Sequence, residues 1–268
     1  MAKYKKKRVR ELQHDRFRDT TMTLVDRLGN LLEGRGSSIL YALGGLLVAA
    51  LIVVVFIKWN GRKNDEARQA LGRAINISSG SIAGATTPGS STGPTFNSEQ
   101  ERAQKAIEEF EKVAAKYGDP YKTEARYFIA TNRLSLDRPK AISELSELSN
   151  SSVTEVAVLS KFALAQAKEA DGKLDEAAQI YAEVARLNNE IVPAETANLR
   201  LAKVYEKQGK KKEAADLLFA IVDGSRKQKG KDGLPLPPSA AARDAADELQ
   251  KLDPDRYAQL PPEAPPLG

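Results

Sequence analysis

The residue types that carry most enzyme chemistry are scarce in this sequence. It contains one histidine, His14, and no cysteine, which excludes a site with two imidazoles, a thiolate metal site and a cysteine nucleophile. The stretch from Gly224 to Lys231 comes nearest to a phosphate-binding loop. Five residues separate its glycines where four are required, however, and Asp232 stands where Ser or Thr belongs. We therefore predict no catalytic residue, no metal site and no cofactor, and we expect a protein that is not an enzyme.

The carboxylates are numerous but fall in segments rich in alanine, glutamate and lysine, where a solvated helix face is the ordinary explanation. Charged residues make up 29% of the 268 residues and aromatic residues 6%, a balance that favours a helical protein over a β-sandwich. Residues 1–35 hold ten basic and five acidic residues, whereas the remaining residues hold 31 of each sign. The net charge of +5 therefore belongs to the N-terminal tail.

An uncharged segment of 21 residues, from Ser37 to Ile57, predicts a transmembrane helix. At about 1.5 Å per residue such a helix is about 30 Å long, the thickness of a hydrocarbon core. The long tail before it, and the lack of a small-residue cleavage motif after it, favour an uncleaved anchor. Ten basic residues precede the segment and three follow it closely (Lys58, Arg62 and Lys63). The positive-inside rule then places the N-terminus in the cytoplasm and the rest of the chain outside the membrane.

Inside this anchor, Ala42, Gly45 and Ala49 form a small-residue face that would let two helices approach closely. A homodimer through this face is one explanation, and the ordinary abundance of small residues in membrane helices is the alternative. The predicted domain boundaries are 1–36 for a basic cytoplasmic tail with an amphipathic helix, 37–58 for the anchor, 59–98 for a first repeat helix and a Ser/Gly-rich loop, 99–222 for repeats, 223–252 for a loop and a capping helix, and 253–268 for a Pro-rich tail.

Alanines recur through the segment after the anchor at a nearly constant interval. Four of them lie 35, 36 and 37 residues apart: Ala106, Ala141, Ala177 and Ala214. Three more precede the last three of these by eleven or twelve residues: Ala130, Ala165 and Ala202. Two antiparallel helices need a small residue on each where they cross, so this spacing predicts one helical hairpin per repeat.

Signals for helix ends accompany the alanines. Gly172 and Gly209 are expected to lie in turns between paired helices, and capping boxes predict helix starts at Ser98 and Ser152. A helix over residues 65–77 would pair with the helix that begins at Ser98, so the first hairpin is interrupted by the Ser/Gly-rich loop. A last helix over residues 240–252 is expected to cap the stack, and the chain from residue 254 onward is expected to be extended or disordered.

This pattern resembles the tetratricopeptide repeat over residues 99–222. The segment FALAQAKEADGKLDEAAQIYAEVARLN carries the family's small residue at Ala165, its turn glycine at Gly172 and its aromatic residue at Tyr181. The segment NLRLAKVYEKQGKKKEAADLLFAIV repeats the pattern with Ala202 and Gly209. The resemblance implies an all-α fold class: a single N-terminal transmembrane helix followed by a tetratricopeptide-repeat-like α-solenoid of about three to four helical hairpins.

The resemblance also implies that the first helix of each hairpin lines a concave, protein-binding groove. Candidate groove residues follow from the alanine positions in three rows: Tyr127, Phe162 and Leu199; Thr131, Gln166 and Lys203; Leu134, Glu169 and Glu206. The family's carboxylate clamp needs Lys and Asn at such positions, and these rows are mostly apolar or uncharged. An extended hydrophobic segment or a partner helix fits them better. The alternative is that these side chains pack against the adjacent helix.

The whole layout resembles the YfgM-like family, whose best-known member is the ancillary subunit of the SecYEG translocon. The resemblance implies a bacterial inner-membrane protein with a periplasmic repeat domain that links translocon subunits or secreted chains to periplasmic chaperones. It rests on architecture and on the packing alanines, and the Ser/Gly-rich loop and Pro-rich tail depart from the family pattern. The alternatives are a scaffold of cell-envelope biogenesis or division, and a mitochondrial import receptor with cytosolic repeats. No nucleic-acid partner is expected, because few aromatic residues interleave the basic run.

Overall fold

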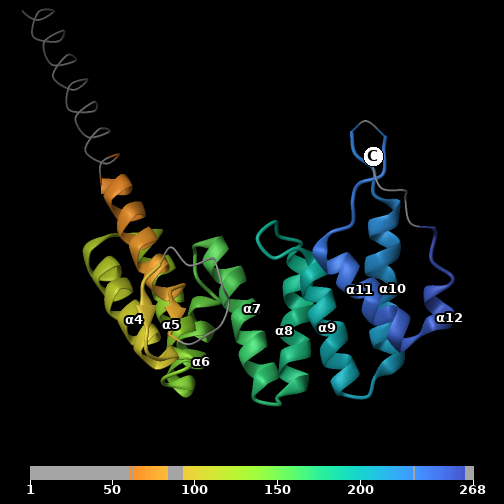
Figure 1. The fold of residues 1–268 in the computed structure, drawn as a ribbon, viewed down its shortest axis with the longest axis horizontal. Coiled ribbons are helices and arrows are strands. Elements are labelled where there is room, and N and C mark those ends of the chain that lie inside the picture. The colour runs from red at the N-terminus through yellow and green to blue at the C-terminus, as the bar shows by residue number, and fades with distance from the viewer. Residues whose placement is uncertain (1–60, 62, 84–92, 232, 263–268) are drawn as a thin grey trace, which may run out of the picture. The chain divides into compact units, whose positions relative to one another are not determined.

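Helical hairpins follow one another along the chain (Figure 1). The computed structural model describes residues 61, 63–83, 93–231 and 233–262, and the chain from Asp65 onward forms one compact unit. Its helices are one over residues 63–78, then α4 (Glu99–Lys116), α5 (Tyr121–Arg133), α6 (Arg138–Leu148), α7 (Thr154–Ala170), α8 (Leu174–Leu187), α9 (Ala194–Lys207), α10 (Lys211–Lys227), α11 (Ala240–Leu252) and α12 (Pro254–Tyr257). The helix over residues 63–78 pairs with α4, and α5–α6, α7–α8 and α9–α10 pair likewise. The fold of this unit is a tetratricopeptide-like α-solenoid, as predicted.

The predicted tail, amphipathic helix and membrane anchor lie outside the described residues, and so do Ala42, Gly45 and Ala49. Within the ranges that the structure describes, none of the helices combines the length and the apolar character needed to cross a bilayer. The anchor and its small-residue face therefore stay predictions from the sequence.

The repeated alanines lie where neighbouring helices meet. All seven have an exposed fraction of 0%. Ala130 belongs to a cluster formed by α5, α6 and α7, and Ala165 and Ala177 belong to one formed by α7, α8 and α9. Ala202 and Ala214 belong to the next cluster, which joins α9 and α10 to α11. Each core cluster therefore spans consecutive helices, and the predicted role of the alanine spacing is confirmed.

The two predicted glycine turns share one backbone geometry. Gly172 has φ 73° and Gly209 has φ 76°, a left-handed conformation that favours glycine. After α7, the N–H of Lys173 donates to the carbonyl of Lys168, five residues back, at 2.9 Å, and after α9 Lys210 donates to Tyr205 at 2.9 Å. This bond with a glycine in the left-handed region is the Schellman ending of a helix. The same motif closes two successive first helices and sets the same reversal of direction.

The helix starts agree with the sequence in one case and differ in the other. The Ser98 Oγ accepts from the Glu101 N–H at 3.1 Å, which confirms the cap of α4, although the Glu101 carboxylate accepts from the N–H of Asn97 and not of Ser98. The predicted cap at Ser152 is wrong. Val153 is the residue before α7, and its apolar side chain makes no cap bond. The Ser151 hydroxyl accepts from the Val153 N–H in the turn before the helix.

The interrupted first hairpin is confirmed. Leu71 and Ala74 of the first helix share a core cluster with Phe110 of α4, and the Phe110 ring stacks on Phe128 of α5 with centroids 4.9 Å apart. The ends of the connecting loop pair as two short parallel strands, β1 (Ser81–Ile82) and β2 (Thr95–Phe96). This pairing, which the sequence did not predict, brings the two ends of the Ser/Gly-rich loop together.

The C-terminal region is more ordered than predicted. Helix α10 runs to Lys227, five residues beyond the predicted end of the repeats, and α11 has the predicted bounds. The expectation of an extended chain after residue 254 is wrong for its first part. Helix α12 begins there, and Leu260 is buried in the cluster that joins α9, α10 and α11. The ring of Tyr257 lies 5.6 Å from the Arg226 guanidinium. The segment is ordered because it covers the last apolar helix faces.

The alanine contacts make a direct prediction about stability. Ala214→Leu on α10 inserts three carbons where no space exists, so we expect a loss of about 1–3 kcal/mol in the free energy of unfolding. Ala220 lies on the same helix and is exposed, so Ala220→Leu is the matched control and should change that free energy by less than about 0.5 kcal/mol. Urea denaturation of the purified chain measures both. Equal losses would show that helix propensity, and not crossing geometry, governs these positions.

Candidate protein-binding surface

The predicted apolar row mostly packs inside the stack. Leu199 is only 7% exposed and belongs to the core cluster of α9, α10 and α11. Phe162 is half-buried, and its ring meets the buried ring of Tyr181 edge-on, with centroids 5.6 Å apart. Tyr127 is half-buried against the cluster around Ala130, and burial raises the pKa of its hydroxyl. Each of these residues lies three positions before a crossing alanine and therefore on the same side of its helix. This row therefore packs against neighbouring helices, as in the alternative given above, and does not line an open groove.

The other candidates on α5 also turn toward protein. Leu134 is half-buried against the cluster of Ala130 and Leu145. The Thr131 hydroxyl donates to the Phe128 carbonyl at 3.0 Å within the same helix. Gln166 on α7 is the exception, since it is exposed.

Glu169 on α7 is held by partners from two neighbouring helices. Its carboxylate accepts from the Tyr181 hydroxyl of α8 at 2.9 Å and pairs with the Lys207 ammonium of α9. Burial raises the pKa of Glu169, but the hydrogen bonds from Lys207 and Tyr181, with the charge of Lys207, outweigh it and hold the pKa below its usual range. Burial and the Glu169 carboxylate together raise the pKa of the Tyr181 hydroxyl. Glu169 thus stays ionised and joins three helices.

Glu206 occupies the corresponding place on α9 in a different environment. Burial and the nearby carboxylate of Glu248 on α11 raise its pKa, and the charges of Lys203 and Lys251 only partly offset them. The Lys203 ammonium lies 4.0 Å from the Glu248 carboxylate. One carboxylate oxygen of Glu206 is buried and accepts no hydrogen bond from the residues that the structure describes. Glu206 is therefore less fully paired than Glu169 among the residues that the structure describes.

These residues come together on three consecutive first helices. Gln166 and Glu169 lie on α7, and Glu169 contacts α9 through Lys207; Lys203 in turn contacts α11 through Glu248. We call this surface the first-helix face, made of Gln166, Glu169, Lys203, Glu206, Lys207 and Glu248. The sequence located four of its members from their distance to the alanines. The sequence analysis did not identify Lys207 and Glu248. Their positions near the C-terminal ends of predicted helices are the one sequence feature that could have indicated them.

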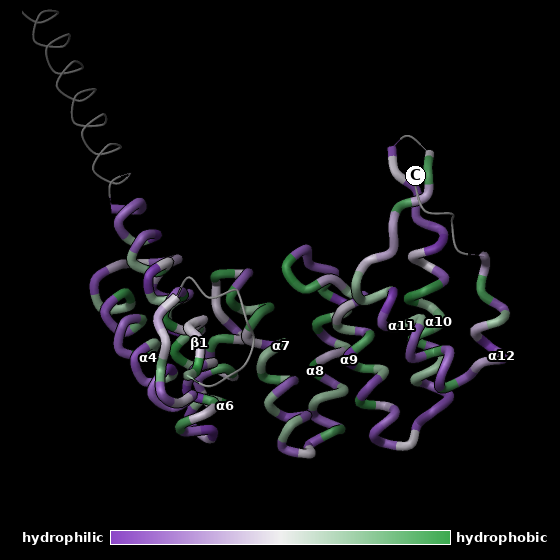
Figure 2. Tube along the Cα trace, in the orientation of Figure 1, coloured by the Kyte–Doolittle hydropathy of each residue, from purple (hydrophilic) through white to green (hydrophobic). Residues whose placement is uncertain are grey.

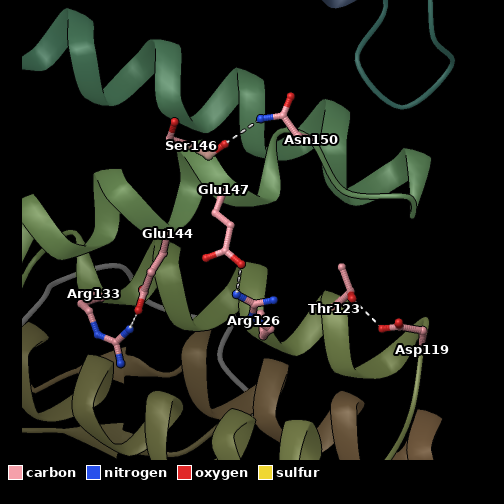
Figure 3. A network of polar contacts seen from close by, with 8 residues as sticks. All are labelled: Asp119, Thr123, Arg126, Arg133, Glu144, Ser146, Glu147 and Asn150. Carbon is pink, nitrogen blue, oxygen red and sulfur yellow. Dashed lines mark hydrogen bonds and ion pairs between the residues drawn. The ribbon is translucent and has the colours of Figure 1, made fainter.

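Polar contacts elsewhere tie neighbouring helices together, as Figure 3 shows for α5 and α6. Arg133, whose side chain is largely buried, pairs with Glu144 of α6 and lies 3.6 Å from the Glu111 carboxylate of α4. Arg126 pairs with Glu147 of α6 at 2.8 Å. These charges bridge neighbouring helices and so help to position the stack. Among the described residues, no three histidine, aspartate or glutamate side chains gather as a metal-ligand set.

No protein-family model matches the sequence, and no curated protein matches it. Among solved structures, two crystal structures are similar, both of nearly identical TPR-like repeats ascribed to a kinesin light chain of Podosopora anserina. Each shares 16% sequence identity, has a TM-score of 0.49 and covers 72% of this chain and 88% of that chain. At this level the likeness carries no argument about function. The solenoid fold rests on the hairpins and packing alanines described above.

The opposite pKa shifts of the two glutamates make a paired prediction. Glu169→Gln should lower the free energy of unfolding at pH 7 by about 1 kcal/mol, because the ionised carboxylate loses charge-assisted hydrogen bonds. Since the folded-state pKa of Glu169 is depressed, this stabilisation is present above the ordinary glutamate pKa of about 4.3 and is lost as the pH falls below it. The difference between wild type and Glu169→Gln should shrink accordingly.

Glu206→Gln is the matched control, because a raised folded-state pKa means that the charged form is disfavoured by folding. We expect this variant to be as stable as wild type at pH 7 or more stable, with the difference vanishing on acidification. Urea unfolding of the purified chain between pH 3 and pH 7 measures both variants. A loss for Glu206→Gln as large as that for Glu169→Gln would show that the two environments are alike.

Proposed function

We propose that this protein is a single-pass membrane scaffold whose repeat unit binds other proteins through the first-helix face. The observation that carries the proposal is the row of charges of both signs on α7, α9 and α11. Lys203, Glu206 and Lys207 all lie on α9 and are half-buried or exposed. The stacked hairpins hold these side chains at a fixed spacing, and the charged groups do not take part in the apolar core. A rigid scaffold with preset polar groups loses little conformational entropy on binding.

The charges on this face suit a partner segment that is itself polar. Lys207 has more than half of its side chain exposed, and Glu206 lacks a partner for one oxygen among the described residues. An incoming basic or amide group would satisfy that oxygen, and an incoming carboxylate would pair with Lys207. Lys207 can donate to a second carboxylate without leaving Glu169, whose side chain is only 11% exposed. We therefore propose a polar extended segment or polar helix as the bound element.

For the partners themselves we propose translocon subunits, periplasmic chaperones or secreted chains. The support is the predicted anchor over residues 37–57, the predicted orientation and the resemblance to the YfgM-like family. A scaffold anchored beside the translocation pore would hold chaperones where chains emerge. The proposed location is the bacterial inner membrane, with the N-terminus in the cytoplasm and the repeat unit in the periplasm.

Photo-crosslinking in cells tests the binding surface. A photoreactive amino acid replaces Gln166 on the first-helix face, and the control replaces Gln179, which is also exposed but lies on the second helix α8. We expect the probe at Gln166 to capture translocon subunits, a periplasmic chaperone or secreted chains, identified by mass spectrometry, and the probe at Gln179 to capture few. Equal capture from both positions would contradict a binding role specific to this face.

Membrane attachment is tested separately by deletion of residues 37–57. Full-length protein should resist alkaline extraction from membranes, whereas the deletion variant should be released, because a helix of this length and apolarity partitions into the bilayer. A cysteine introduced at Gln179 should react with a membrane-impermeant thiol reagent in cells with permeable outer membranes, and one at Ala2 should not. The chain has no native cysteine, so each signal is unambiguous. Reaction only at Ala2 would reverse the proposed orientation.

A further inference from the structure

The connections between successive hairpins carry most of the exposed large apolar side chains among the described residues. These side chains are Leu187 at the end of α8, Ile191 between α8 and α9, and Leu234 and Leu236 between α10 and α11. Leu136, in the turn inside the α5–α6 hairpin, and Ile75, on the first helix, lie elsewhere. Figure 2 shows hydrophobic stretches in both of these connections. Apolar exposure is therefore concentrated in two neighbouring loops.

Both connections belong to the same edge of the repeat unit. In an antiparallel stack every connection from a second helix to the next first helix lies at the end where the first helices begin, and Figure 1 shows the two loops on one side. The Glu195 carboxylate, in the first turn of α9, accepts from the Ser239 hydroxyl at 2.6 Å and from the Gln228 side-chain amide at 3.5 Å. The base of the α10–α11 connection is thus bound to the start of α9.

The α10–α11 connection forms an ordered arm. The Gly230 N–H donates to the Leu234 carbonyl at 2.8 Å, and the Leu236 N–H donates to the Gln228 carbonyl at 3.1 Å. Gly233, with φ 79°, allows the chain to reverse between them. The arm holds exposed leucines next to exposed lysines, Lys229 and Lys231, in a fixed geometry.

The charge of this arm is positive. The connection itself, residues 228–239, contains two basic residues, Lys229 and Lys231, and one acidic residue, Asp232. Arg226 is bonded to the Pro261 carbonyl and Lys227 to Asp223. Lys229 and Lys231 thus remain beside the leucines. Exposed apolar side chains flanked by lysines are the composition that binds the interface of an anionic bilayer.

The chain enters the repeat unit at this same edge, because Asp65 lies near the start of the first helix. The anchor proposed above ends at Ile57, eight residues earlier, and eight residues reach at most about 28 Å. An anchor in the bilayer would therefore keep the start of the first helix within that distance of the membrane surface.

We infer that the edge formed by the α8–α9 and α10–α11 connections rests on the bilayer, with Ile191, Leu234 and Leu236 in the lipid interface and Lys229 and Lys231 on anionic headgroups. The inference rests on the proposed anchor. It adds a second membrane contact to the repeat unit.

The test uses the full chain in vesicles of phosphatidylcholine and phosphatidylglycerol. Single cysteines replace Ile191, Leu236 or Leu136 and carry an environment-sensitive dye; the three side chains are 42%, 45% and 41% exposed, so Leu136 is a matched control in a turn inside a hairpin. We expect the dyes at Ile191 and Leu236 to shift to shorter wavelength and to lose most of their fluorescence when nitroxide lipids are included. The dye at Leu136 should do neither. The double substitution of Lys229→Gln and Lys231→Gln should reduce quenching at Leu236 in anionic vesicles.

Flotation and alkaline extraction of the same vesicles distinguish the two proposals. Chain that stays with the vesicles while the dyes at Ile191 and Leu236 resemble the dye at Leu136 would overturn the edge contact and leave the anchor standing. Chain that is released would overturn both. A third outcome is that nitroxide lipids do not quench the dyes at Ile191 and Leu236, and that these dyes shift to shorter wavelength only when a protein partner is added. That outcome would assign the edge to a protein contact and overturn the bilayer contact.

Discussion

Close approach of helices at alanine is the constraint on which the rest of this structure depends. Seven alanines at repeat-related positions have no exposed surface, and each lies where one helix crosses another. A larger side chain at any of them would separate the helices and displace every later hairpin, because each hairpin packs only on its neighbours. The fixed crossings leave the outer positions of the helices free to vary. We therefore expect the functional residues of such a fold on its surfaces and in its connections, and not in its core.

Polar side chains supplement this packing at the boundaries between hairpins. Glu169 joins α7 to α8 and α9, and Arg133 joins α5 to α4 and α6. Arg138, at the start of α6, donates to the Ala167 carbonyl near the end of α7 at 2.8 Å. These contacts fix the register between neighbouring helices, which non-directional apolar packing alone does not specify. Glu206 on α9 has no comparable partner for one of its carboxylate oxygens among the described residues.

The parts of the fold that depend on local spacing could be predicted from the sequence. The alanine interval predicted the hairpins, Gly172 and Gly209 predicted the turns, and residues 240–252 predicted α11 within its observed bounds. Contacts between distant segments could not be predicted this way. The strand pair β1–β2 and the docking of Leu260 join residues far apart in the chain, and no local periodicity encodes them.

The candidate surface likewise contains features that local spacing could predict and features that depend on contacts between distant segments. Positions three residues before an alanine share its buried side, so Leu199 and Phe162 pack inward, and helix geometry alone could have corrected that expectation. Of the positions just past the alanines, Gln166 is exposed, whereas Thr131 and Lys203 are half-buried. The pairing of Glu169 with Lys207 spans 38 residues, and only the stacked helices bring these two charges together.

The central claim is that proteins bind the first-helix face and not the outer helices. The most direct measurement is quantitative co-purification from solubilised membranes with Gln166→Arg, which adds bulk and charge to that face, and with Gln179→Arg, which adds the same group to α8. Both glutamines are exposed, so neither change should disturb the fold, and circular dichroism checks this. We predict that Gln166→Arg loses the proteins that co-purify with wild type and that Gln179→Arg keeps them. Retention by both variants, or loss only from Gln179→Arg, would contradict the account.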